Sequence, residues 1–96
     1  MADWVEGPVT RVIDGDTFDM RVEWVGRANS GRYGNEERIR IAGLDAPEVG
    51  SPGGTSATER LRRRIGGKHV RCTIQARDTY GRLVCQVKVV PKRNAA

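Results

Sequence analysis

Residues 9–24 read VTRVIDGDTFDMRVEW, two strand-like runs joined by a turn. In the second run polar and apolar residues alternate, which is typical of a strand with one buried face. The apolar residues on that face are Phe18, Met20, Val22 and Trp24. Asp14-Gly15 lies between the runs, and tight hairpin turns prefer this dipeptide because both central residues need positive φ. The stretch predicts an antiparallel hairpin.

Three more strands are expected downstream. Residues 38–42 place Ile39 and Ile41 on one face and follow a polar, Gly-rich loop at 26–36. Residues 68–76 and 83–90 alternate in the same way and are joined by the turn at 78–81. A symmetric turn pairs Ile74 with Cys85 and Cys72 with Val87, so that the two cysteines become diagonal neighbours on one face. We therefore expect buried, reduced thiols and no disulfide.

A helix is predicted between the third and fourth strands. Ser56 and Glu59 match the capping-box pattern that begins helices. The apolar face consists of Ala57, Leu61 and Ile65, each four residues apart. Gly66-Gly67 ends the helix, because glycine tolerates the left-handed position after the last turn. The opposite face carries Arg60, Arg62, Arg63 and Arg64, which either contact phosphates or form a solvated face.

This order of elements is mainly β with one helix. Five short strands with a helix between the third and fourth are what a five-stranded, Greek-key OB-fold barrel needs. With 96 residues, the chain is expected to form a single domain over residues 1–96. OB barrels often bind nucleic acids or sugars, although the fold alone does not determine a function.

The composition is basic. Lys and Arg number 17 against 12 Asp and Glu, for a net charge of +5, and fourteen of the basic residues are Arg. Arginine matches phosphate oxygens, so the balance indicates either a polyanionic partner such as nucleic acid or simply a solvated surface. No apolar stretch approaches the ~18 residues that cross a bilayer, and no signal peptide is visible, so we expect no membrane association. The compartment is left undetermined.

Four acids lie beside turns or in loops and could hold a cation. They are Asp14, Asp16, Asp45 and Glu48. Carboxylates and loop carbonyls are hard oxygen ligands suited to Ca²⁺ or Mg²⁺. An EF-hand starting at Asp14 is excluded, because its sixth position holds Asp19 instead of glycine. Plain turn chemistry remains an alternative explanation for Asp14.

No nucleophilic triad or phosphate-binding glycine loop is recognised, and His69 is expected to pack on a strand. Two arginines are notable by position alone. Arg40 lies on the polar face of the third strand, five residues before Asp45, and Arg82 ends the last turn.

Three segments together resemble the signature of the staphylococcal (thermo)nuclease family. They are residues 12–17 (VIDGDT), residues 40–48 (RIAGLDAPE) and residues 78–82 (DTYGR), in the order of the family and with the helix in the expected gap. The match covers residues 8–90. It implies an OB-fold, Ca²⁺-dependent phosphodiesterase that cuts single- or double-stranded DNA and RNA and leaves a 3′-phosphate and a 5′-hydroxyl.

By this resemblance, Asp16 and Asp45 would supply the calcium carboxylates and Ala46 a backbone carbonyl ligand. A well-known member has threonine in place of Ala46, which matters little if only the carbonyl binds. Asp14 would lie behind the ligands and support them.

The resemblance also assigns the groups that act on the phosphate. Glu48 would be the general base, Arg40 and Arg82 would clamp the scissile phosphate, and Tyr80 would lie near a phosphate of the bound nucleotide. Calcium and two guanidinium groups can stabilise the charge that develops on a phosphodiester in the transition state.

One departure from the family leaves an alternative open. Family domains usually continue into further elements, and this chain is expected to lack the usual C-terminal helices. An apolar patch exposed by their absence would favour a homodimer. The alternative function is a non-catalytic OB-fold module that binds nucleic acid or protein. A weaker alternative is a structural barrel in which the acids and arginines only pair with each other.

Overall fold

A computed structural model describes residues 2–48 and 50–93 of the chain. The expected domain boundaries, residues 1 and 96, lie outside this range. The elements in chain order are β1 (Trp4–Asp14), β2 (Thr17–Arg21), β3 (Trp24–Val25), β4 (Glu36–Ile41), α1 (Gly54–Ile65), β5 (His69–Arg77) and β6 (Leu83–Val89). No helix among these residues is long and apolar enough to cross a membrane.

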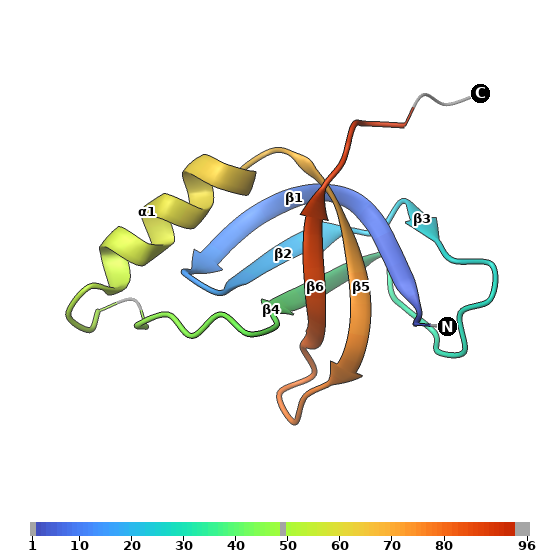
Figure 1. Cartoon of the computed structure of the whole chain (residues 1–96), viewed down its shortest axis with the longest axis horizontal. Coiled ribbons are helices and arrows are strands. Elements are labelled where there is room, and N and C mark those ends of the chain that lie inside the picture. The colour runs from blue at the N-terminus through green and yellow to red at the C-terminus, as the bar shows by residue number, and fades with distance from the viewer. Residues whose placement is uncertain (1, 49, 94–96) are drawn as a thin grey trace.

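Five strands close into a barrel. The strand order is β2-β4-β6-β5-β1, and the pairing of β1 with β2 closes the ring. All of these pairs are antiparallel except β4 with β6, which pair in parallel over Ile39–Ile41 and Leu83–Cys85. The single described helix follows β4 and precedes β5, so the predicted five-stranded, OB-like barrel is confirmed. In Figure 1, α1 lies on one side of the barrel and β3 on the other.

The barrel interior is filled by side chains from every long strand. The largest fully buried ones are Phe18, Met20, Ile39, Leu83, Val5, Val70, Cys72 and Cys85. Burying one such aliphatic or aromatic side chain stabilises the fold by about 1.5–3 kcal/mol. Both cysteines are free thiols in this core, and the predicted pairings Ile74–Cys85 and Cys72–Val87 are confirmed.

The predicted second strand is shorter than its alternating pattern. β2 ends at Arg21, and Trp24 belongs to the two-residue β3, which pairs with Val5 and Glu6 of β1. The prediction that Trp24 shares the buried face of Phe18 is therefore wrong, since Trp24 is exposed. Alternation persists past the point where the chain leaves the barrel, so periodicity alone did not locate the end of β2.

The first hairpin forms as predicted, but the reason given for its glycine is wrong. Asp14 pairs with Thr17 across a two-residue turn, and neither Gly15 nor Asp16 has positive φ. Gly15 is instead required by close packing, because a Cβ there would lie 2.6 Å from the Cβ atoms of Ala46 and Ala57. The missing side chain lets the turn contact both the loop after β4 and α1.

The helix starts earlier than predicted and without the capping box. α1 begins at Gly54 after Gly53, whose φ is 80°, and no side chain caps it. Ser56 is already inside the first turn and so cannot cap, while Glu59 pairs with Arg62. The predicted apolar face is buried. The helix ends at Ile65 and is followed by Gly66 and by Gly67, whose φ is 70°, as predicted.

Candidate active site

The predicted site residues come from three segments that the barrel brings to one edge. The β1–β2 turn carries Asp16, the end of β4 carries Arg40, and the start of β6 follows Arg82. Thr17 pairs with Arg40 across β2 and β4, and the N–H of Ile41 donates to the carbonyl of Asp16 at 2.8 Å. The parallel pairing of β4 with β6 then places the start of β6 beside the end of β4.

Asp16 is a fixed, nearly buried carboxylate, with 7% of the residue exposed. Its Oδ1 accepts the Thr17 hydroxyl at 2.8 Å and its Oδ2 accepts the N–H of Ala46 at 3.3 Å. Burial opposes ionisation, but the hydrogen bonds from Asp14, Thr17 and Ala46 outweigh it and lower the pKa of Asp16. Asp16 is therefore held as an ionised acceptor.

Asp45 is the opposite kind of carboxylate. Its side chain is 98% exposed, and its Oδ1 accepts from Nη2 of Arg40 at 3.0 Å. The same Nη2 lies 3.7 Å from Oδ2 of Asp16. Two carboxylate oxygens, from a turn and from a loop 29 residues later, thus approach one positively charged atom.

Asp14 lies next to Asp16 in the β1–β2 turn. Its Oδ1 accepts the backbone N–H of Asp16 at 3.2 Å. Burial, followed by the hydrogen bond and charge of Asp16, raises the pKa of Asp14. Asp14 therefore supports the turn that carries Asp16, while its predicted role behind the calcium ligands stays a prediction.

Arg82 is held from two sides. Its Nε donates to Oδ2 of Asp78 at 2.7 Å, and its Nη1 lies 3.5 Å from the Thr17 hydroxyl. Partial desolvation acts to raise the pKa of Asp78, but hydrogen bonds from the backbone and side chain of Arg82 outweigh it and lower that pKa. Because the Thr17 hydroxyl also donates to Asp16, Thr17 connects Arg82 to the turn that carries Asp16.

Tyr80 forms an exposed rim beside Arg82. It is 84% exposed, and the Arg82 guanidinium lies 5.3 Å from the ring centroid. The structure thus places Tyr80 next to the predicted phosphate clamp, while its contact with a nucleotide stays a prediction.

Glu48 is not joined to this cluster. It is exposed in the loop that follows β4, and its carboxylate makes no hydrogen bond or ion pair with residues 2–48 or 50–93. Its backbone carbonyl accepts from the N–H and hydroxyl of Ser51, which closes a small turn. The role predicted for Glu48 stays a prediction.

Sequence reasoning missed two residues of this site. Thr17 links Asp16 to Arg82, and Asp78 orients Arg82. Thr17 lies in the quoted hairpin segment, and Asp78 precedes Arg82 by four residues in the last turn. Both were interpreted only as strand or turn residues. Thr17 meets Arg82 only when the barrel closes, whereas Asp78 lies four residues from Arg82 in the same turn, and this spacing is the local signal that could have found it.

A cavity of 200 Å³ borders the cluster on the helix side. Gly15, the loop from Leu44 to Pro47 and the α1 side chains Ala57, Arg60, Leu61 and Arg64 line it. Neither Arg60 nor Arg64 pairs with an acid among the described residues, whereas Arg62 pairs with Glu59. Of the helix arginines, Arg60 and Arg64 are therefore the ones that share this cavity with Asp45.

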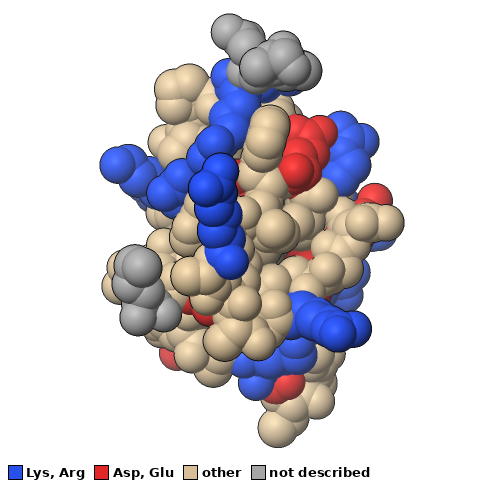
Figure 2. All heavy atoms as spheres, turned by 90° about the vertical axis from the view of Figure 1, so that its right-hand side faces the viewer, with Lys and Arg blue, Asp and Glu red and all other residues tan. Residues whose placement is uncertain are grey.

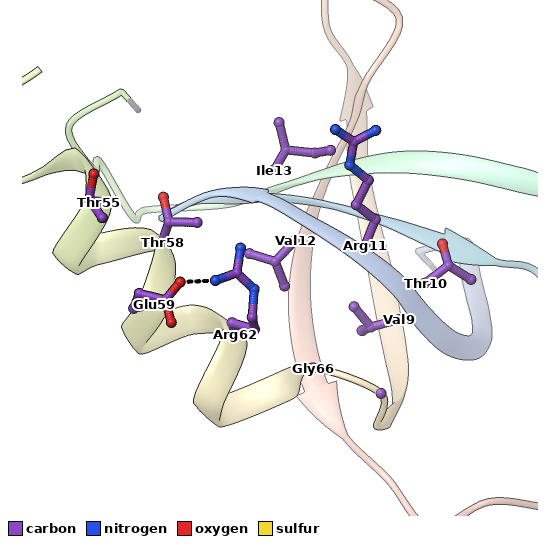
Figure 3. Close-up of a pocket in the computed structure, with 11 residues that line it drawn as sticks. Val9, Thr10, Arg11, Val12, Ile13, Thr55, Thr58, Glu59, Arg62 and Gly66 are labelled. Atoms are coloured by element: carbon purple, nitrogen blue, oxygen red, sulfur yellow. Dashed lines mark hydrogen bonds and ion pairs between the residues drawn. The ribbon is translucent and has the colours of Figure 1, made fainter. Parts of the chain in front are cut away.

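A larger groove of 640 Å³ lies between β1 and α1, away from the carboxylates. Figure 3 shows Thr58, Glu59 and Arg62 of α1 facing Val9 and Val12 of β1 across it. None of the predicted site residues lines this groove.

Side chains alone supply only part of the ligands that a calcium ion would need at this edge. Within residues 2–48 and 50–93, no group of three or more His, Cys, Asp or Glu side chains could hold a metal. A cation at this edge would therefore rely on the carboxylates of Asp16 and Asp45 together with backbone or solvent oxygens, which are ligands that Ca²⁺ accepts.

Comparison with known proteins places this geometry in a family. Residues 38–95 match the family described as Staphylococcal nuclease homologue. The chain is 35% identical to a probable endonuclease LCL3 of Schizophyllum commune, over 93% of this chain and 37% of the relative. It is 34% identical to an uncharacterized endonuclease of Escherichia coli O157:H7, over 86% of this chain and 48% of the relative.

A micrococcal nuclease of Shigella flexneri is 36% identical, over 79% of this chain and 38% of the relative. The chain thus spans between 37% and 48% of the length of these three relatives. With the matched barrel and the motif segments at one edge of it, the chain belongs to the staphylococcal nuclease family.

Proposed function

We propose that this chain is a calcium-dependent phosphodiesterase that hydrolyses DNA and RNA to products with a 3′-phosphate and a 5′-hydroxyl. The observation that carries the proposal is the approach of Asp16 and Asp45 to one nitrogen of Arg40, with Arg82 joined to the same turn through Thr17. The names of the relatives, endonuclease and micrococcal nuclease, support a nucleic-acid substrate.

In this proposal Asp16, Asp45 and the backbone carbonyl of Ala46 hold the calcium ion. Two carboxylate oxygens already flank a positive charge here, and the lowered pKa of Asp16 keeps it ionised. When bound, the ion supplies positive charge that stabilises the phosphate as negative charge develops on it.

Arg40 and Arg82 bind the non-bridging oxygens of the scissile phosphate. Arg40 lies between the two carboxylates, and Arg82 is oriented by Asp78, so neither guanidinium needs to be ordered when the substrate arrives. Preorganised donors of this kind contribute on the order of 10²–10³ in rate each.

Glu48 takes one proton from the attacking water. The water oxygen bonds to phosphorus, the bond from phosphorus to the 5′ oxygen breaks, and the leaving oxygen takes a proton from solvent. An exposed carboxylate with no partner among the described residues can accept that proton without losing another contact.

The neighbouring phosphates of the polymer lie along α1. Arg60 and Arg64 line the cavity next to Asp45 and Ala46, one helical turn apart, and have no acidic partner among the described residues. Their charges would bind the backbone without regard to base sequence.

The test is cleavage of heat-denatured DNA by the purified chain in millimolar calcium and in excess EGTA. We expect cleavage only with calcium, and products that a polymerase extends only after phosphatase treatment, since a 3′-phosphate blocks extension. Directly extendable products would contradict the bond assignment. Binding without cleavage in either condition would favour the alternative of a non-catalytic module.

A further inference from the structure

A second cleft lies beside β3, on the side of the barrel away from the loop that carries Asp45 (Figure 1). Its volume is 470 Å³, and both tryptophans of the chain, Trp4 and Trp24, line it together with Arg27 and Arg93. Among residues 2–48 and 50–93, no aspartate or glutamate lines it. The cleft thus combines aromatic surface with positive charge.

Trp4 is held rigidly at the base of this cleft. The Arg71 guanidinium stacks 4.1 Å from its ring centroid. The side-chain oxygen of Asn29 accepts the backbone N–H of Trp4 at 3.1 Å, and its amide group donates to the backbone carbonyl of Trp4 at 3.0 Å. A residue whose backbone is held by Asn29 and whose ring stacks on Arg71 loses little conformational entropy when a ligand binds.

Trp24 and Arg93 form the open wall. Trp24 is 41% exposed, and the Arg93 guanidinium lies 5.1 Å from the Trp24 ring and 5.7 Å from the Trp4 ring. Arg93 is oriented by Glu6, which is 4% exposed and accepts from its Nε at 3.0 Å and its Nη2 at 2.9 Å. The Arg93 side chain lines the cleft and does not fill it.

The charge of the rim is not neutralised. Glu6 is shared between Arg71 and Arg93, so the pair of arginines keeps a net positive charge. Arg27 at the rim pairs with no acid in the described part of the chain. Figure 2 shows this side of the molecule, with Lys and Arg side chains more prominent than Asp and Glu.

We propose that this cleft binds single-stranded nucleic acid, with a base stacked on Trp24 and the Arg93 guanidinium and a phosphate on Arg27. Aromatic rings interleaved with arginines bind single strands because every base has a face that stacks, whereas paired bases hide those faces. The inference rests on the proposed function for its ligand class, but it does not require the calcium site to be active.

The experiment uses the intrinsic fluorescence of the chain, since its two tryptophans both line the cleft. A short oligothymidylate is titrated in EGTA, so that no cleavage is measured. We expect quenching of the tryptophan emission. In anisotropy with a labelled oligomer, Trp24→Ala should weaken binding by about 5- to 150-fold, and Trp24→Phe should retain most of the affinity.

Arg27→Ala provides a second variant, because an exposed loop arginine is not needed for folding. It should reduce the slope of log affinity against log salt by about 0.7, the value for one phosphate contact on a single strand. The matched control is Arg63→Ala, which removes an exposed arginine on α1. In this variant the oligomer should quench the tryptophan emission as it does in the wild type, because Arg63 lies outside the cleft.

Three outcomes would overturn the proposal: no quenching by the oligomer, unchanged affinity in Trp24→Ala, or equal quenching by oligoglutamate or duplex DNA. The last would mean that charge alone attracts the ligand. Because EGTA removes calcium, any of these three outcomes would leave the calcium-dependent cleavage of the proposed function untouched. Conversely, a failure to observe cleavage in calcium would leave the quenching result untouched.

Discussion

Asp16 and Asp45 approach the same atom, Nη2 of Arg40, from opposite environments. Asp16 is packed in a turn and lies 3.7 Å away, while Asp45 lies 3.0 Å away on a side chain almost fully in solvent. One carboxylate is thus fixed and the other can adjust its position. This asymmetry makes their expected contributions to cation binding and to folding separable.

Replacing Asp45 or Asp16 with asparagine should weaken calcium binding by about tenfold or more, because ligand charge sets calcium affinity. Asp45→Asn should leave the melting temperature unchanged, since its side chain is exposed. Asp16→Asn should also destabilise the fold by about 1–3 kcal/mol, because a buried hydrogen-bond acceptor is altered. Calorimetric titration and thermal melts measure the two effects. Unchanged calcium affinity in both variants would remove these residues from the metal site.

Glu48→Gln should lower kcat by about 10²–10⁴ without changing stability, because glutamine cannot accept the proton from water. Turnover of denatured DNA under saturating calcium is the measurement. Glu36→Gln is the matched control, since Glu36 is also exposed and its side chain has no partner among the described residues. Full activity of Glu48→Gln would exclude Glu48 as the base.

Asp78→Ala should reduce activity through Arg82. Removing the 2.7 Å contact frees the guanidinium, so kcat should fall while the KM for long substrates changes less. Asp78→Glu should restore part of the loss, which a purely structural role of the turn would not explain. The control is Glu23→Ala. It also removes an ion pair, the one between Glu23 and Arg21, but this pair lies outside the candidate site.

The double replacement of Arg60 and Arg64 by alanine should weaken binding of single-stranded DNA. It should also reduce its salt slope by about 1.4, corresponding to two lost phosphate contacts. Hydrolysis of a minimal nucleotide diester should be unaffected, because such a substrate has no flanking phosphates. An unchanged salt slope would mean that these arginines are only a solvated face.

Asp3 should make the stability depend on pH in the acid range. The Tyr33 hydroxyl donates to it at 2.6 Å and, with the N–H groups of Ser30 and Gly31, lowers the pKa of Asp3 to about 2. Since the folded pKa lies below the unfolded value of 3.8, this stabilisation is present above about pH 4 and lost as the pH falls towards 2.

Asp3→Asn should therefore melt at a lower temperature than the wild type near neutral pH and lose less stability between about pH 4 and 2. Thermal melts across that range test the difference. Parallel curves for the two proteins would contradict the assignment of this acid sensitivity to Asp3.

Much of the fold could be predicted because its signals are local. Alternation located the barrel strands, the four-residue spacing of Ala57, Leu61 and Ile65 located the helix, and the pairing of Cys72 with Val87 followed from the turn. The errors arose where tertiary packing overrides local preference. Gly15 is needed for its close contact with Ala46 and Ala57, and Ser56 lies inside the first turn because the helix already begins at Gly54.

The sequence by itself determined where the barrel strands and the helix lie along the chain, the helix face and the three motif segments that identify the family. Those properties depend on neighbours within a few residues along the chain. Only the tertiary structure decided that Thr17 contacts Arg82, that Arg40 lies between Asp16 and Asp45, and that Trp4, Trp24 and Arg93 share a cleft. These groups meet because the barrel closes and two of its strands pair in parallel, which brings together residues that no local pattern connects.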